Sequence, residues 1–313
     1  MNVSNFVSFK KRLVDNCSRV IVGKEPVIEQ VVVCLIASGH VLLEDVPGTG
    51  KTMLLRAFAR SLGGSFKRIQ FTPDLMPSDL TGINFYNQKQ GEFVFRPGPL
   101  FANLILADEL NRATPRSQAA LLEVMEEKQI SVDGKTYPME EPYMIMATQN
   151  PLESYGTFPL PEAQMDRFFM RLKLGFMTRE QEISVMRRSE TRAIIDELEQ
   201  VVTPEELFAL RKDYPKVAVS DDVAGYMMDI IERTRSDSLL IHGVSTRGTQ
   251  ALYRACQIRA ALNGRDYVIP EDVKAEAVSV LPHRITLVGS SHIDDDLFIS
   301  RILEEIRVPL ETL

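Results

Sequence analysis

The chain has 313 residues, of which 44% are hydrophobic and 25% charged, and its formal net charge at pH 7 is −7. This composition is ordinary for a soluble globular protein, and the acidic balance argues against a nucleic-acid motor, which usually carries a basic face for phosphates. We expect a cytoplasmic protein without a membrane span, because no apolar run reaches about 18 residues and the three scattered cysteines fit a reducing compartment.

The first half of the chain alternates between helical and strand-like patterns. Helices are expected over Val3–Ser18, from Lys24 onward, over 52–62 and over Pro115–Glu127. Between them lie short apolar runs of strand length, at 40–43, 66–70, 104–107, 143–147 and 169–174. Buried strands that alternate with helices predict a parallel sheet covered on both faces, which is an α/β fold.

From about residue 178 the strand patterns nearly vanish and helix starts take their place. Thr178 and Thr203 each precede a Gln or Glu by three residues, which predicts capping boxes, and further helices are expected over 245–263 and from Pro270. The sequence therefore predicts an α/β domain over residues 1–176 and a smaller, all-helical domain over 177–313.

Two segments depart from this alternation. The Asp133-Gly134 pair lies between two strand-like runs within 129–137 and predicts a hairpin. The polar and aromatic stretch 83–95 interrupts the α/β pattern as an insert.

A phosphate-binding loop is predicted directly after the strand 40–43. Gly48 and Gly50 allow the backbone N–H groups to curl toward phosphate oxygens at the start of a helix. Lys51 can reach the β- and γ-phosphates, and Thr52 offers a hydroxyl to Mg²⁺. The alternative is a glycine-rich turn with an incidental lysine, since Asp45 stands where the general pattern has glycine.

Polar residues follow two other apolar strands. Asp108 would lie near Mg²⁺ if its strand is the neighbour of the phosphate-loop strand, and Glu109 could then polarise the attacking water. Asn150 ends the strand that should lie beside this pair, where it could orient the water or contact the γ-phosphate. The alternatives are a helix cap for the two carboxylates and an Asn-Pro turn for Asn150.

Two arginines complete the pattern. Arg167, at the exit of a short helix, suits a finger that supplies positive charge to the γ-phosphate of a neighbouring subunit. Arg247 opens a helix of the second domain and could reach back to the nucleotide. A surface ion pair is the alternative for Arg167.

Together these segments resemble the AAA+ superfamily of ATPases, and more closely its MoxR family. The motifs that carry the resemblance span 43–52, 71–75, 107–113, 147–151, 160–168 and 281–284, and Asp45 is a residue that MoxR proteins often carry. The resemblance implies a five-stranded parallel core, a helical lid and a ring of subunits, usually a hexamer. It also implies ATP and Mg²⁺ as cofactors.

The resemblance assigns roles residue by residue. Thr52 and Asp108 would manage Mg²⁺, Glu109 would be the catalytic base, and Asn150 the first sensor. Arg167 would act in trans, and Arg247 would be the second sensor. The nucleotide would be held by residues of two loops, with Ile21 beside the first of them: Val22, Gly23, Pro47, Gly48, Thr49, Gly50, Lys51, Thr52 and Met53.

Less is implied about partners. Arg112 could also act across the subunit boundary, and the inserts 83–95 and 129–137 often face the pore or a partner in this clade. The family suggests a chaperone-like ATPase that remodels, assembles or activates partner proteins or metal-containing complexes, often with a von Willebrand factor A domain. A nucleotide-gated regulatory binding module is the alternative, and a nucleic-acid motor is less favoured.

Overall fold

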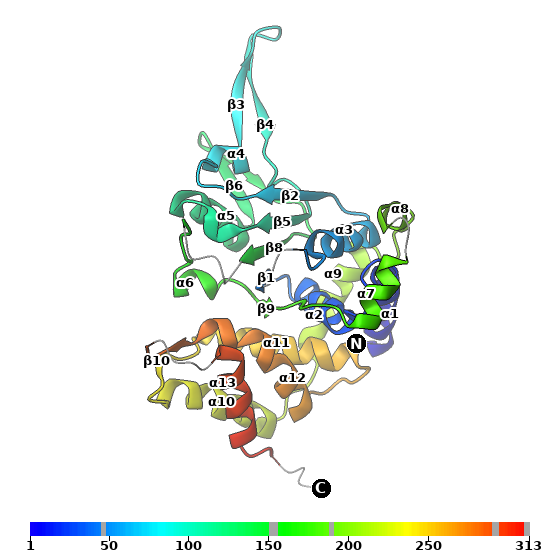
Figure 1. Cartoon of the computed structure of the whole chain (residues 1–313), viewed down its shortest axis with the longest axis vertical. Coiled ribbons are helices and arrows are strands. Elements are labelled where there is room, and N and C mark those ends of the chain that lie inside the picture. Colours follow the sequence, from blue (N-terminus) through cyan, green and yellow to red (C-terminus); the bar gives the residue numbers. More distant parts are fainter. Residues whose placement is uncertain (45–47, 150–155, 188–190, 290–293, 310–313) are drawn as a thin grey trace.

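The computed structural model describes residues 1–44, 48–149, 156–187, 191–289 and 294–309, and it shows an α/β core next to a helical lid (Figure 1). The core sheet has five parallel strands in the order β2-β5-β8-β1-β9. Their bounds are β1 (Val41–Glu44), β2 (Phe66–Gln70), β5 (Leu104–Asp108), β8 (Met144–Gln149) and β9 (Met170–Leu172). The predicted parallel sheet is confirmed. The expectation that the strand of Asp108 adjoins the phosphate-loop strand is wrong, because β8 lies between β5 and β1.

Side chains alternate along each strand between the two faces of the sheet, and an apolar cluster covers each face. Val41 and Leu43 of β1 join the apolar cluster on the side of α1 (Val3–Ser18), α2 (Glu25–Ile36) and α3 (Lys51–Leu62). Leu42 joins a second cluster on the side of α5 (Pro115–Glu127). None of the helices within the described ranges is long and apolar enough to span a membrane.

The second half of the chain is helical apart from one short ribbon. Its helices are α7 (Arg179–Met186), α8 (Thr191–Asp196), α9 (Pro204–Asp213), α10 (Asp221–Ser236), α11 (Thr246–Leu262), α12 (Pro270–Val280) and α13 (Asp295–Glu305). The capping boxes at Thr178 and Thr203 are confirmed. The ribbon pairs β10 (Leu240–His242) with β11 (Thr286–Leu287), so the domain is not all-helical. Helix α8 packs on α3, and α9 packs on α1 and α2, so both contact helices of the α/β core. The domain boundary at 176/177 therefore stays a prediction.

The two inserts are both antiparallel hairpins. The segment 83–95 forms most of β3 (Gly82–Asn87) and β4 (Glu92–Pro97), which follow α4 (Pro77–Thr81) and project from the body (Figure 1). The expected Asp-Gly hairpin consists of β6 (Gln129–Val132) and β7 (Lys135–Pro138). Asp133 and Gly134 both have positive φ, as a tight hairpin turn requires. Phe95 stacks on Tyr137 at 4.3 Å between ring centroids, which joins the two hairpins.

Candidate active site

The predicted phosphate loop has the backbone shape that its glycines suggest. Gly48 (φ 89°) and Gly50 (φ 94°) both lie in the left-handed region, which disfavours other residues. A Cβ atom at either position would meet nothing within 4 Å, so the loop leaves open space above its backbone. Helix α3 begins at Lys51, and Thr49, Lys51, Thr52 and Met53 are all half-buried. Pro47 lies outside the described residues. An open loop at a helix N-terminus with a lysine fits the phosphates of a nucleotide.

The loop expected beside adenine lies against the first helix after β9. A Cβ atom on Gly23 would be 1.8 Å from Gln181 Nε2, so only glycine permits this approach to α7. Lys24 Nζ donates to the carbonyl oxygen of Phe176 at 2.8 Å, which fixes the same two segments. Val22, half-buried, precedes this contact, and its role beside adenine stays a prediction.

The two carboxylates after β5 are tied together by one threonine. Thr148 Oγ1 donates to Asp108 Oδ1 at 2.7 Å and accepts from the backbone N–H of Glu109 at 2.8 Å. Glu109 adopts φ 59°, a conformation that costs on the order of 1 kcal/mol for a non-glycine residue. Asn150 follows two residues after Thr148 and lies outside the described residues.

This group and the phosphate loop share the carboxyl edge of the sheet. The ends of β1 and β5 are separated by one strand, which places them about 10 Å apart at the usual strand spacing. Crevices at this edge are where open α/β sheets bind their ligands. A carboxylate such as Asp108, together with the hydroxyl of Thr52, suits Mg²⁺, which prefers oxygen ligands.

The sequence reasoning missed two residues of this group. Arg68 and Gln70 lie on the edge strand β2, where Arg68 Nη2 is 2.6 Å from Asp108 Oδ2 and Gln70 Nε2 donates to Glu109 Oε2 at 2.7 Å. Their spacing of two residues, which places both side chains on one face of a strand, was the available signal. Arg112 Nε lies 3.2 Å from Glu109 Oε2, so this arginine engages the carboxylate of its own chain.

The two predicted arginines lie together at the other end of the core. Arg167 Nη2 is 3.1 Å and Arg247 Nη2 is 2.7 Å from the carboxylate of Glu126, near the end of α5. Met125, the residue before Glu126, brings this helix end beside His40, because His40 Nε2 donates to the carbonyl oxygen of Met125 at 3.0 Å. His40 precedes β1 and the phosphate loop follows it, so β1 separates the arginines from the loop. The expectation that Arg247 reaches back to the nucleotide stays a prediction, and this arrangement leaves open which subunit's nucleotide it serves.

The lid holds the segment that carries Arg167. Asp166 accepts hydrogen bonds from Ser245 Oγ at 2.7 Å and from Arg284 Nε at 2.8 Å. His283 Nε2 donates to the carbonyl oxygen of Phe168 at 3.0 Å, and burial lowers the pKa of His283 well below its ordinary value, which keeps the ring neutral. Movement of the lid would therefore move the Asp166-Arg167 segment with it.

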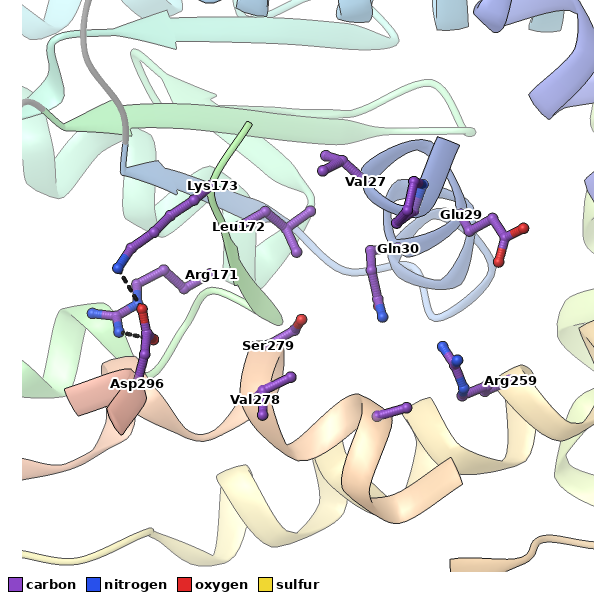
Figure 2. A pocket seen from close by; sticks show the side chains of 12 residues that line it. Val27, Glu29, Gln30, Arg171, Leu172, Lys173, Arg259, Val278, Ser279 and Asp296 are labelled. Carbon is purple, nitrogen blue, oxygen red and sulfur yellow. Dashed lines mark hydrogen bonds and ion pairs between the residues drawn. The ribbon is translucent and has the colours of Figure 1, made fainter. Parts of the chain in front are cut away.

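A second contact joins the lid to the strand before the phosphate loop. Arg171 of β9 is buried and reaches Glu44 Oε2 at 3.1 Å and Asp296 Oδ1 of α13 at 2.6 Å. Lys173, the residue after β9, also pairs with Asp296. Figure 2 shows both cations reaching toward this carboxylate, beside a cavity of about 440 Å³. Burial raises the pKa of Glu44, an effect that Arg171 opposes.

Comparison with known proteins agrees with this geometry. The profile of the "ATPase family associated with various cellular activities (AAA)" matches residues 40–170, and an AAA lid domain matches residues 232–306. The protein YeaC of Bacillus subtilis is 45% identical over 303 residues, covering 96% of this chain and 95% of YeaC. The chaperone MoxR1 of Mycobacterium tuberculosis is 38% identical over 311 residues, covering 96% of this chain and 82% of MoxR1.

A solved crystal structure shows the same fold over the full length. The protein, from Cytophaga hutchinsonii and described as an ATPase, is 37% identical to this chain, with a TM-score of 0.89 and 98% coverage of both chains. The phosphate loop, the paired carboxylates and these similarities over nearly the whole chain lead to one conclusion: this chain is an ATPase that belongs to the MoxR family of AAA+ proteins.

Proposed function

We propose that this ATPase works as a ring, a hexamer by family resemblance, in which each nucleotide site is completed by the neighbouring subunit. The observation that carries the proposal is the position of Arg167, which is separated from the phosphate loop of its own chain by the length of β1. A four-residue strand spans about 13 Å, so a guanidinium at its far end serves a second copy better than its own.

Within each site the residues divide the work. Lys51 and the N–H groups of the loop bind the phosphates. Glu109 polarises the attacking water, and Asn150 orients it. Arg167 of the adjacent copy stabilises the charge that develops on the γ-phosphate.

Mixing experiments test the shared site directly. Lys51→Ala and Arg167→Ala should each be inactive alone, and Glu109→Gln should bind ATP without turnover. Mixing the first two should restore activity on the order of a quarter of wild type, because some sites then combine an intact loop with an intact arginine. Specific activity of the wild type should also rise with protein concentration. If Arg167→Ala keeps full activity, and if its specific activity does not change with protein concentration, a monomeric switch would be favoured instead.

We further propose that the cycle remodels, assembles or activates a protein partner. The likeness to a chaperone, MoxR1, supports this class of work, and the projecting β3–β4 hairpin offers exposed aromatic side chains, Tyr86 and Phe93. A partner protein should stimulate ATP hydrolysis by this chain. The protease sensitivity of the partner should change only when Glu109 is intact. Nucleotide-dependent binding that is equal for wild type and Glu109→Gln, with no change in the partner, would support a nucleotide-gated binding module.

A further inference from the structure

One carboxylate holds two arginines that come from separate parts of the fold. Glu126 Oε2 lies 3.1 Å from Arg167 Nη2, which follows α6 (Glu162–Met165), and Glu126 Oε1 lies 2.7 Å from Arg247 Nη2, at the start of α11 in the lid. Arg167 Nη1 also donates to the carbonyl oxygen of Leu122, one turn earlier on α5, at 2.9 Å. The guanidinium of Arg167 is thus fixed by two acceptors of the same helix.

This group borders one acidic and one basic cavity. In the acidic cavity Arg167 is joined by Glu123, Glu126 and Glu127. A cavity of about 480 Å³ beside it is lined by four arginines, namely Arg167, Arg247, Arg254 and Arg284. Arg284 is paired with Asp166, whereas Arg254 lies over the ring of Phe169 and forms no ion pair with the described part of the chain. Without the charge of Glu126, Arg167 and Arg247 would repel one another across the boundary between core and lid.

Arg167 and Arg247 keep N–H donors that do not bond to Glu126. An arginine has five N–H donors, and the contacts described here use the two Nη atoms of Arg167 and one Nη atom of Arg247. Both side chains remain partly exposed, at 31% for Arg167 and 48% for Arg247. A phosphate group of another molecule could therefore bind both arginines while Glu126 stays in place.

We propose that Glu126 is a positioning residue for hydrolysis: it holds Arg167 and Arg247 side by side so that both face the nucleotide phosphates of the neighbouring subunit. This inference rests on the shared site proposed above. Since Glu126 belongs to the core and Arg247 to the lid, the same carboxylate also fixes the lid arginine relative to the finger. In this arrangement Arg247 acts in trans.

The test is the kinetics of Glu126→Gln, which keeps the shape and removes the charge. Misplacement of a catalytic group by about 1 Å can cost on the order of 100-fold in rate, so we expect kcat to fall about 10- to 100-fold. KM for ATP should change little, because ATP is bound by the phosphate loop of another subunit. Glu126→Asp, which keeps the charge on a shorter side chain, should recover part of the lost kcat.

Glu123→Gln is the matched control. Glu123 lies about one turn earlier on α5 and lines a cavity together with Arg167 and Glu126, but it forms no ion pair with the described residues. Its substitution removes the same charge from the same surroundings. It should keep wild-type kcat.

The outcomes separate this inference from the proposed function. Suppose Arg167→Ala is inactive and is complemented by Lys51→Ala, yet Glu126→Gln has wild-type or raised kcat. The shared site then stands, and the positioning role of Glu126 is overturned. A parallel loss of kcat in Glu123→Gln would overturn it as well, by showing a general effect of charge. Failure of the mixing experiment itself would instead remove the shared site.

Discussion

Gln70 Nε2 donates a hydrogen bond of 2.7 Å to Glu109 Oε2, across the neighbouring strands β2 and β5. Arg112 Nε lies 3.2 Å from the same oxygen, so the Glu109 carboxylate is held from two sides. We expect Gln70→Ala to lower kcat about 3- to 10-fold with little change in ATP affinity, because a general base works best when a third group orients it. Steady-state kinetics and nucleotide binding measure the two effects separately.

Lys67→Ala is the control for this prediction. Lys67 is exposed on the same strand, with its side chain on the opposite face from Arg68 and Gln70. Its substitution should leave kcat unchanged. An equal loss in both variants would show that the edge strand, rather than the hydrogen bond, sets the rate.

Removing the hydroxyl of Thr148 should affect both stability and turnover. Thr148 is buried and bridges Asp108 to the backbone of Glu109. Thr148→Val keeps the shape and leaves both partners without this contact, which should cost about 1–3 kcal/mol in the free energy of unfolding and lower kcat. Thr148→Ser retains the hydroxyl and should retain most of both. A larger loss in Thr148→Ser than in Thr148→Val would mean that the methyl group, and not the hydroxyl, is what matters.

His40 should make the protein less stable as the pH falls. Burial lowers its pKa from 6.5 to about 4, and the neutral ring accepts from the backbone N–H of Ile145 while donating to the carbonyl oxygen of Met125. The unfolded chain takes up a proton below pH 6.5 and the folded chain does not, so stability is lost between pH 6.5 and 4. The stability advantage of wild type over His40→Gln should shrink by on the order of 2 kcal/mol from pH 7 to 4.5.

Glu276 should act in the opposite direction. It is fully buried on α12 of the lid and contacts Gln30 of α2 at 3.2 Å, and burial, opposed by Arg259, raises its pKa from 4.5 to about 7. Its contribution to stability is present below pH 4.5 and is lost as the pH rises through 7. Between pH 5 and 8, Glu276→Gln should therefore gain on wild type by on the order of 2 kcal/mol in urea unfolding.

Local signals in the chain predicted most of the fold. Val3–Ser18 and Pro115–Glu127 have the predicted bounds, because apolar periodicity and a proline start are properties of the segments themselves. The order of the strands was less accessible: that β8 separates β1 from β5 depends on contacts between distant segments, which periodicity does not encode.

The candidate site divides in the same way. The loop of Gly48 and Gly50 follows from local backbone chemistry, and its shape agrees with the prediction. Glu126 could not be found from the sequence, because an exposed glutamate on a helix has no distinguishing pattern until the fold brings Arg167 and Arg247 to it. Which subunit Arg247 serves could not be predicted from the sequence for the same reason, since it depends on the path of the lid over the core.

The root of the β3–β4 hairpin is packed so tightly that it cannot hinge freely. A Cβ atom on Gly82 would lie 2.3 Å from the carbonyl oxygen of Arg96, and one on Gly98 would lie 2.2 Å from that of Leu80. We therefore expect the hairpin to move as one rigid lever with α4. With an arm of about 20 Å, a rotation of about 3° at the root displaces the aromatic tip by about 1 Å. Small changes at the carboxylates of β5 could in this way be delivered as mechanical strokes far from the nucleotide.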